Sequence, residues 1–432
     1  MSTGQSVPTS INATSASLLN PTPRAARGQT PYTSRLLASI RELDADDAKD
    51  LFGDDVEGSR YLEACENAER GTPLRTAMLA VYRADAIVAA APLVQITQRL
   101  DMTFPASVRA VGDMVYKIAP SAIAPPFWCL GTRTSEECPL GFRSTLTPEE
   151  RDEAFSMLLA GLARHASEAR VKLLGLKCLT DQDARWAHGL LSAAGYVRMP
   201  TPPTAVLHLP FADEAGYLAS LSYKMRKDFR KKIKGFNDVE VEIRHTFEGI
   251  EKECIELLEA TKAKKRTKTD YGEFSEVPHS YLSEITKALG SRTIIVLTRV
   301  DGILTSFSLS MIDRDRFILA YLGMRYPLAQ ERDIYFLNWI TCVRYCLEHR
   351  ISWLHAGVST YRQKVRFGCK LKRCWTYLKY TGPVIGPVLR RIVPHIGIDS
   401  MDPDLAAFGK DAPYLSPDVA TGTPLRPVHN HA

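Results

Sequence analysis

The stretch from Arg292 to Tyr380 constrains the fold more than any other part of the chain. It begins with two apolar, β-branched runs, RTIIVLTRV and ILTSFSLSMI, which are joined by Asp301 and Gly302. Both residues of that dipeptide accept positive φ angles, so the pattern predicts a β-hairpin. The run RFILAYLGM predicts the next strand.

A helix and a further strand follow. In IYFLNWITCVRYCLEHR the apolar residues recur at intervals of three and four, which predicts an amphipathic helix. ISWLHAGV then predicts a buried strand. The order hairpin, strand, helix, strand predicts a crossover at which the backbone opens, an arrangement suited to acyl transfer.

The first half of the chain repeats this order less clearly. Two short helices are expected at residues 44–52 and 59–69, followed by a hairpin around Arg83-Ala84-Asp85. Residues 100–143, interrupted by prolines, are expected to be irregular. A helix at 148–166, the strand VKLLGLKCL, a helix at 181–194 and the strand AVLHLPF complete the unit. Two copies of one α+β unit, each a mixed sheet with flanking helices, are therefore predicted.

The chain divides at changes in composition. The start of the chain is rich in Ser, Thr, Pro and Ala, and its end is rich in Pro, Asp and Gly. Neither segment can bury enough apolar surface to offset the entropy of ordering. The expected parts are a disordered leader (1–31), a first unit (32–210), a basic linking helix (211–236), a second, catalytic unit (237–398) and a loose tail (399–432).

The linking helix carries an apolar stripe and a basic face. Asp213 is the expected N-cap. The stripe is Leu218, Leu221, Met225, Phe229 and Ile233, and the basic residues are Lys224, Arg226, Lys227, Arg230, Lys231 and Lys234. Either this face is solvated, or an anionic partner compensates the repulsion between like charges four residues apart.

A second basic cluster lies further along the chain. It comprises Lys262, Lys264, Lys265, Arg266 and Lys268, and exceeds what capping of a helix C-terminus needs. The loop that follows contains Tyr271, which either stacks on a ligand or packs on its own domain.

Composition excludes several classes of protein. No run of about 18 apolar residues and no secretory signal is present, so we expect a cytoplasmic protein without integral membrane contact. The nine cysteines include no CxxC pair, and no metal-ligand run is found, so no metal site is predicted. No Ser-His-Asp order and no Walker A loop appears, which disfavours hydrolases and kinases.

Three segments resemble the FemAB-like and CelD-like branch of the GNAT acyltransferase superfamily. They are the linking helix YLASLSYKMRKDFRKKIK, the hairpin and strand LTRVDGILTSFSLSMIDRDRFILAYLG, and LHAGVSTYRQKVRFG. The resemblance extends over about residues 77–380. It implies tandem GNAT-like units and transfer of an activated acyl group to a small-molecule or peptide amine, without a tightly bound cofactor.

The donor implied by the resemblance is acyl-CoA, an acyl carrier protein or aminoacyl-tRNA. Acetyl-CoA-dependent members hold pyrophosphate with a glycine-rich loop at the start of the crossover helix. This chain has RYPLAQERDIYF there, without glycine, as in FemAB-like proteins, some of which use aminoacyl-tRNA. Transfer of an acyl group from a thioester is the first hypothesis. The alternative is transfer of an aminoacyl group from tRNA, with the acceptor stem of the tRNA bound along the basic helix. A non-catalytic binding protein with the same fold is the third.

The resemblance and the chemistry of acyl transfer together suggest the site residues. Lys364 matches the family's lysine and would stabilise an oxyanion, or else belongs to a solvated basic turn. Tyr321 to Gly323 would offer backbone N–H groups to the acyl carbonyl, and Tyr321 could face the cleft or the core.

Two further groups are candidate bases. Asp333 could act as base or amine anchor, although acidic residues at a helix start are favoured by its dipole anyway. His355 is either a base or a hydrogen-bonded core histidine. The residues expected to bind substrate are Tyr361, Arg226, Arg230, Lys231, Tyr271 and Gly323.

Overall fold

The computed structural model describes residues 32–72, 75–97, 99, 106–266, 278–383, 385–395, 397, 402–417 and 419. The predicted leader and Tyr271 lie outside these ranges. No helix among the described residues is long and apolar enough to cross a bilayer.

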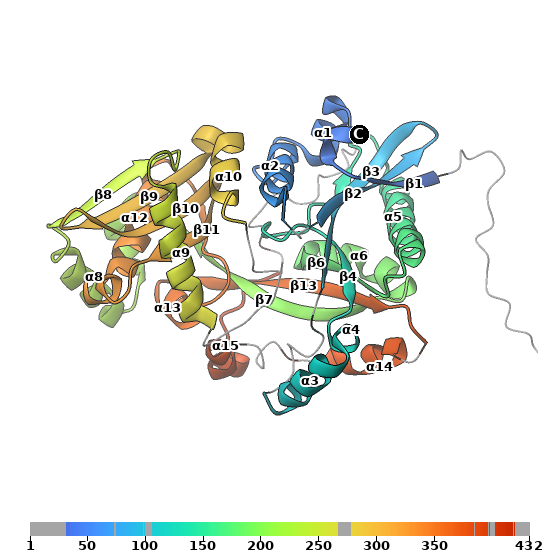
Figure 1. Cartoon of the computed structure of the whole chain (residues 1–432). Helices are drawn as coiled ribbons and strands as arrows, with labels where there is room; N and C mark the ends of the chain where they lie inside the picture. The colour runs from blue at the N-terminus through green and yellow to red at the C-terminus, as the bar shows by residue number, and fades with distance from the viewer. Residues whose placement is uncertain are drawn as a thin grey trace, which may run out of the picture. The chain divides into compact units, whose positions relative to one another are not determined.

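Within the described ranges, 13 strands form one mixed sheet, flanked by helices, which confirms the predicted α+β class (Figure 1). The strands are β1 (Tyr32–Leu37), β2 (Arg75–Arg83), β3 (Ala86–Thr97), β4 (Pro126–Leu130), β5 (Gly141–Phe142), β6 (Leu173–Thr180), β7 (Val197–His208), β8 (Val239–Arg244), β9 (Thr293–Val300), β10 (Ile303–Asp313), β11 (Arg316–Met324), β12 (Trp353–His355) and β13 (Lys370–Tyr380). The order across the sheet is β1-β2-β3-β4-β6-β13-β7-β12-β11-β10-β9-β8, with β5 paired to β3.

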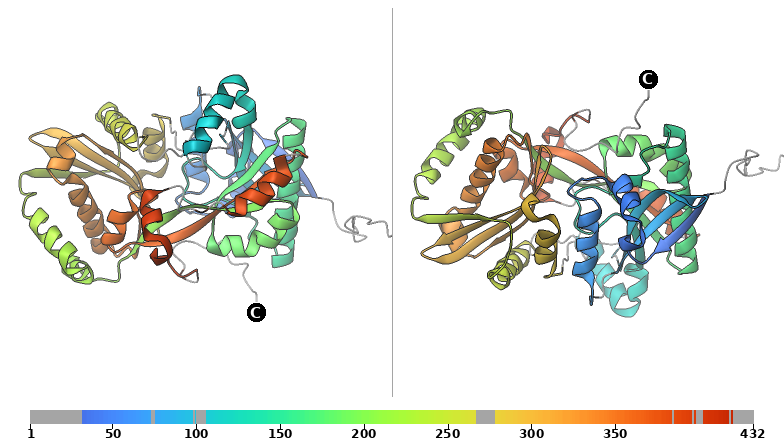
Figure 2. Two further views of the ribbon diagram at one scale, coloured as in Figure 1. Left: turned by 90° about the horizontal axis from the view of Figure 1, so that it is seen from below. Right: turned by 90° about the horizontal axis from the view of Figure 1, so that it is seen from above.

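The helices cover both faces of this sheet. They are α1 (Ala45–Phe52), α2 (Ser59–Glu69), α3 (Ala106–Ile118), α4 (Pro120–Ile123), α5 (Pro148–Glu168), α6 (Asp181–Ala193), α7 (Glu214–Ser220), α8 (Tyr223–Ile233), α9 (Glu251–Arg266), α10 (Tyr281–Leu289), α11 (Leu328–Glu331), α12 (Ile334–Glu348), α13 (Tyr361–Arg366), α14 (Ile385–Ile392) and α15 (Pro403–Phe408). Figure 2 shows α8 and α12 on the opposite side of the sheet from α9.

The same element order occurs twice, as predicted. The hairpin β2/β3 corresponds to β9/β10, and the parallel pair β4/β6, connected through α5, corresponds to β11/β12, connected through α12. A short helix and a long strand, α6 with β7 and α13 with β13, end each copy. We call residues 32–208 the first unit and residues 239–380 the second unit.

The two units exchange their last strands. β13 of the second unit lies between β6 and β7, and pairs antiparallel with both. β7 of the first unit pairs on its other edge with β12 of the second unit. Each unit therefore contributes a strand that the other needs to continue its sheet.

Local sequence explains most of the elements. Asp301 and Gly302 have φ angles of 49° and 75°, which form the predicted turn of the β9/β10 hairpin. Asp213 caps α7 by accepting a hydrogen bond from the amide of Gly216 at 2.8 Å. The predicted linking helix is interrupted after Ser220, because Ser222 accepts a hydrogen bond from the amide of Met225 and starts α8 as a new N-cap.

Three local predictions were wrong. Residues 100–143, expected to be irregular, contain α3, α4, β4 and β5. The strand expected over ISWLHAGV is only three residues long, β12. Part of the expected loose tail is packed, since Leu405 of α15 is buried and the amide of Leu371 in β13 donates a hydrogen bond to the Pro413 carbonyl at 2.9 Å.

Candidate active site

The parallel pair of the second unit opens part way along. β11 and β12 are paired only from Arg316 to Ile318 on one strand and from Trp353 to His355 on the other. Beyond Ile318, β11 continues to Met324, and in the part of the chain that the structure describes no strand pairs with it on that edge. The register against β10 also shifts so that Ala320 is an extra, bulged residue. Bulges disrupt the ladder and redirect backbone groups, and they occur often beside active sites.

The equivalent opening in the first unit is filled by the chain itself. β4 and β6 separate after Leu176, and the Lys177 ammonium donates hydrogen bonds to the carbonyls of Thr132 (3.0 Å) and Arg133 (2.9 Å). The Cys138 amide donates to the Cys178 carbonyl at 3.1 Å. Only the second unit therefore offers an opening between its parallel strands among the described residues.

A histidine and a glutamate from different units meet at the end of β12. The His355 side chain is completely buried, and its Nδ1 lies 2.6 Å from Oε2 of Glu136. Burial alone would raise the pKa of Glu136, but the neighbouring His355, Lys372 and Arg316 lower it to about 2. The carboxylate is therefore ionised and accepts a hydrogen bond from Nδ1–H. In the neutral imidazole this leaves a lone pair on Nε2, which has no hydrogen-bond partner among the described residues.

This pair belongs to a buried charged cluster that connects the units. The amide of Glu136 donates to Oε1 of Glu57 at 2.9 Å, and Lys372 of β13 forms an ion pair with Glu137. Burial, and then the negative charge of Glu136, raise the pKa of Glu57 to about 8. At neutral pH the protonated carboxyl group of Glu57 thus lies near the ionised carboxylate of Glu136.

Protonation of Glu57 predicts a specific pH dependence of stability. Its pKa is higher in the folded protein than in the unfolded chain, so the folded state binds more protons between about pH 5 and pH 8. Raising the pH through this range should therefore lower the free energy of unfolding by a few kcal/mol, at about 1.4 kcal/mol per pKa unit. Glu57→Gln should flatten this dependence, measured as the thermal midpoint at pH 6 and pH 9. The exposed-residue control Glu240→Gln should keep the wild-type slope; an equal slope in Glu57→Gln would contradict the assignment.

A hydroxyl cluster lies next to the opening, where α2 packs against α10. The Tyr61 hydroxyl lies 2.9 Å from that of Tyr281 and donates to Thr134 Oγ1 at 2.7 Å. The Tyr281 ring makes an edge contact with Tyr321 of β11, with 5.4 Å between the ring centroids. Burial raises the pKa of Tyr321, which keeps its phenol protonated.

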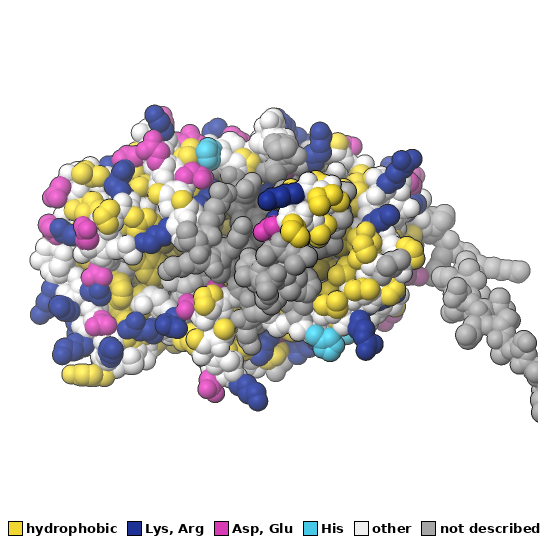
Figure 3. All heavy atoms as spheres, turned by 60° about the horizontal axis from the view of Figure 1, so that its bottom comes forward, with side chains coloured by type: hydrophobic (Ala, Val, Ile, Leu, Met, Phe, Trp, Pro, Cys, Tyr) yellow, Lys and Arg dark blue, Asp and Glu magenta, His cyan; other side chains and the backbone are white. Residues whose placement is uncertain are grey.

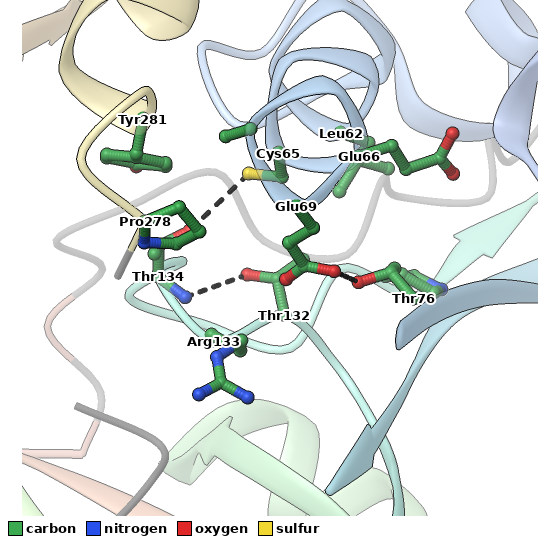
Figure 4. Close-up of a pocket in the computed structure, with 12 residues that line it drawn as sticks. Leu62, Cys65, Glu66, Glu69, Thr76, Thr132, Arg133, Thr134, Pro278 and Tyr281 are labelled. Atoms are coloured by element: carbon green, nitrogen blue, oxygen red, sulfur yellow. Dashed lines mark hydrogen bonds between the residues drawn. The ribbon is translucent and has the colours of Figure 1, made fainter. Parts of the chain in front are cut away.

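A pocket opens beside this cluster (Figure 4). It is lined by α2, by the start of β2, and by the segment that follows β4. In Figure 4 the Glu69 carboxylate points toward Thr76, whose hydroxyl donates a hydrogen bond to it, and Cys65 points toward Thr134. The lining residues are Leu62, Cys65, Glu66, Ala68, Glu69, Thr76, Pro92, Thr132, Arg133, Thr134, Pro278 and Tyr281. The wall carries two carboxyl groups, those of Glu66 and Glu69, and the guanidinium of Arg133.

Lys364 lies on α13, close to the end of β12. Its side chain is buried, and Nζ donates hydrogen bonds to the carbonyls of Ala356 (2.6 Å), Gly357 (3.2 Å) and Val358 (3.4 Å). These carbonyls follow His355 directly, so Lys364 fixes the backbone beside the histidine. The alternative, in which Lys364 belongs to a solvated basic turn, does not fit a buried side chain.

Two residues expected at the substrate have packing roles instead. The Tyr361 hydroxyl is buried and donates to the carbonyl of Pro203 at 2.8 Å. Gly323 is buried beneath α9, where a Cβ atom would lie 2.4 Å from the Phe307 ring and 2.8 Å from the Leu258 amide nitrogen. Glycine is therefore required at 323 for α9 to approach β11.

Asp333 lies at the start of α12. It has a left-handed backbone (φ 52°) and pairs with Lys232 of α8. Its carboxylate makes no capping hydrogen bond, but it adds a negative charge near the end of the helix at which a pyrophosphate would otherwise find positive charge. Both this negative charge and the absence of glycine from RYPLAQERDIYF therefore argue against pyrophosphate binding at the start of α12.

The basic residues of α8 are separate from the charged cluster. Arg226 donates to the Ala219 carbonyl at 2.8 Å, whereas Arg230 and Lys231 are exposed. Within the described ranges, four exposed cations of α8 and the residue that caps its end form no ion pair: Lys224, Lys227, Arg230, Lys231 and Lys234. The structure thus brings His355 and Lys364 together, with Tyr321 further along β11, and places Asp333 with α8.

Sequence reasoning missed Glu57 and Glu136. Glu136 belongs to the segment between β4 and β5, which was expected to be irregular, and contacts a residue 219 positions away. The adjacent acidic residues Glu136 and Glu137 between Cys129 and Cys138 were the only local signal.

Comparison with known proteins gives three findings. A family model described as an acetyltransferase (GNAT) domain matches residues 223–365. No curated protein matches the sequence. Among solved structures, FemX has 13% identity and a TM-score of 0.52, and the match covers 83% of this chain and 99% of FemX. A tandem GNAT protein from the clavulanic acid biosynthesis pathway has 10% identity and a TM-score of 0.44, covering 81% and 99%.

Proposed function

We propose that the second unit, which contains most of the residues matched by the acetyltransferase (GNAT) domain model, transfers an acyl group from a thioester to an amine. One observation carries this proposal. The parallel strands of the second unit separate beyond Ile318 beside a histidine, whereas the matching opening in the first unit is filled by its own chain. The first unit supplies Glu136 and the wall of the acceptor pocket.

The thioester would lie between β11 and the segment that follows β12. Residues of the bulged strand around Tyr321 would direct backbone N–H groups at the acyl carbonyl, where negative charge develops as the amine attacks. Lys364 contributes by holding the opposite wall in place through the carbonyls of residues 356–358. In this proposal the pantetheine arm belongs either to CoA or to a carrier protein, since both present the same thioester.

The acceptor amine would approach from the pocket between α2 and α10. Its nitrogen attacks the carbonyl carbon, the C–S bond breaks, and the amide forms as the thiolate leaves. Nε2 of His355 would take the proton lost by the amine, directly or through water, and Glu136 would stabilise the resulting imidazolium. The leaving thiolate would take its proton from solvent, and the Tyr321 phenol, which burial keeps protonated, would donate a hydrogen bond to it.

A turnover assay with a panel of acyl thioesters and amines tests this proposal. We expect release of free thiol that depends on both the thioester and an amine, detected with a thiol reagent, together with an amide product detected by mass spectrometry. Asp333→Asn distinguishes the modes of donor binding. If CoA is gripped at the start of α12, removing the carboxylate should tighten its binding several-fold. Absence of amide from every thioester in the panel would reject the thioester proposal.

Transfer from aminoacyl-tRNA is the second candidate, and the unpaired cations of α8 favour it. If five to six phosphates are bound, affinity for charged tRNA should fall by roughly 10³-fold or more between 50 and 200 mM salt. Filter binding across this range measures the slope. Lys227→Ala with Lys231→Ala should reduce the slope by about two. No binding of charged tRNA at low salt would reject this candidate.

A further inference from the structure

Two helices that are distant in sequence leave apolar side chains in solvent. On α14, Ile385, Val388 and Ile392 are 37%, 50% and 39% exposed. Their spacing of three and four residues places them on one stripe of the helix. Such a stripe would normally face a core, so its exposure indicates a binding surface.

The second helix is α3. Its exposed apolar residues are Met114 (65%), Val115 (36%), Tyr116 (40%) and Ile118 (85%). Together the two helices hold seven of the thirteen large apolar side chains that are exposed among the described residues. More than half of these exposed apolar side chains therefore belong to two helices.

Both helices lie on the same side of the molecule. Figure 1 shows α3 and α14 below the sheet, and both face the viewer when the molecule is seen from below in Figure 2. In Figure 3, which brings this side forward, hydrophobic side chains gather in groups with Lys or Arg at their margins. We call the exposed apolar residues of α3 and α14 the apolar face.

The charge around the apolar face is positive. Residues 381–397 contain Arg390 and Arg391 and no acidic residue, and both arginines are exposed. Lys117 is exposed beside Ile118 on α3. Asp113 of the same helix is neutralised by an ion pair with Arg99 at 2.8 Å.

We propose that the apolar face docks the protein on the surface of an anionic phospholipid bilayer. Apolar side chains on short helices, bordered by Lys and Arg, match a surface that lies in the headgroup region, with the apolar stripe reaching the acyl chains and the cations pairing with phosphates. The helices lie in the interface and do not span it. This proposal goes beyond acyl transfer and does not depend on it, although it would bring the site close to membrane-bound acceptors.

The charge argues against a second copy of the chain as the occupant. In a two-fold dimer through this face, the patch would contact its own copy. Arg390, Arg391 and Lys117 would then border identical cations, whereas anionic headgroups neutralise them. A bilayer therefore suits both the apolar and the charged residues of the face.

Sedimentation with vesicles tests the proposal on the full chain. Vesicles of pure phosphatidylcholine are compared with vesicles that contain 30% phosphatidylglycerol. We expect binding to the second kind that weakens as salt rises. Ile118→Glu with Val388→Glu should weaken binding by about tenfold or more, since the apolar contacts are lost. Arg390→Ala and Arg391→Ala should each weaken it by about fivefold.

A matched control is available at the other end of the sheet. Ile303, at the tip of the β9/β10 hairpin, is 49% exposed, nearly the same exposed fraction as Val388. The Ile303→Glu variant should bind vesicles like the wild type. All variants change exposed side chains, so their thermal midpoints should match the wild type.

Failure to bind anionic vesicles would overturn the proposal, as would an equal loss of binding in the Ile303→Glu variant. It would also be overturned if light scattering shows a dimer that Val388→Glu dissociates. Turnover of soluble substrates without vesicles should not change in these variants, which keeps this test separate from that of acyl transfer.

Discussion

Replacing His355 with asparagine should lower kcat/KM for acyl transfer by about 10²–10⁴-fold, because the amine loses the group that takes its proton. Asparagine keeps a polar side chain near Glu136 but provides no proton acceptor equivalent to Nε2. The rate should be measured against pH. Raising the pH deprotonates a larger fraction of the amine in solution, so the variant should recover part of its rate as pH rises toward the pKa of the acceptor.

Two controls separate the chemistry from folding. His208→Asn changes an exposed histidine that stacks on Trp353 with 4.5 Å between ring centroids, and should leave kcat/KM within a few-fold of the wild type. Glu136→Gln combined with His355→Asn avoids a buried carboxylate without its partner. If a folded His355→Asn variant turns over at the wild-type rate, His355 is only a core residue and the proposed base is wrong.

Neither unit should fold when it is expressed alone. A fragment of residues 32–235 lacks β13, so the facing edges of β6 and β7 lose their partner. A fragment that begins at residue 236 lacks β7, which leaves β12 paired on one side only. Each fragment would also leave buried charges unpaired, such as Lys372 without Glu137. Circular dichroism should show no cooperative thermal transition for either fragment, and co-expression should restore one.

The fragment experiment has a clear contrary outcome. If either fragment unfolds cooperatively with a midpoint near that of the full chain, the exchanged strands do not hold the units together. A chain cut after residue 235 with both fragments present is the matched control, because it has the same break and all thirteen strands.

The sequence predicts elements whose signal is local. Asp301 and Gly302 specify the β9/β10 turn by their backbone preference, and the helical spacing of apolar residues specifies α12. Asp213 likewise marks the start of α7. The tandem order follows because a hairpin, a strand, a helix and a strand are predicted in the same order in both halves of the chain.

The exchange of strands and most of the site could not be predicted in this way. β7 and β13 read as ordinary strands, and nothing in their composition tells which unit's sheet they join. The role of Glu136 depends on contact with His355 across 219 residues, which no spacing rule detects. Nor does the sequence reveal that Gly323, which was expected to contact substrate, also has a packing role, since the close approach of α9 requires glycine there.

The position of β13 has a consequence for synthesis of the protein. During translation the first unit emerges with an unfilled place between β6 and β7, and that place stays empty until residues 370–380 have left the ribosome. Unpaired strand edges of this kind are templates for association with other chains. We therefore expect a nascent chain stalled before residue 370 to recruit chaperones and to resist proteases poorly, and one stalled well after residue 380 to be protected.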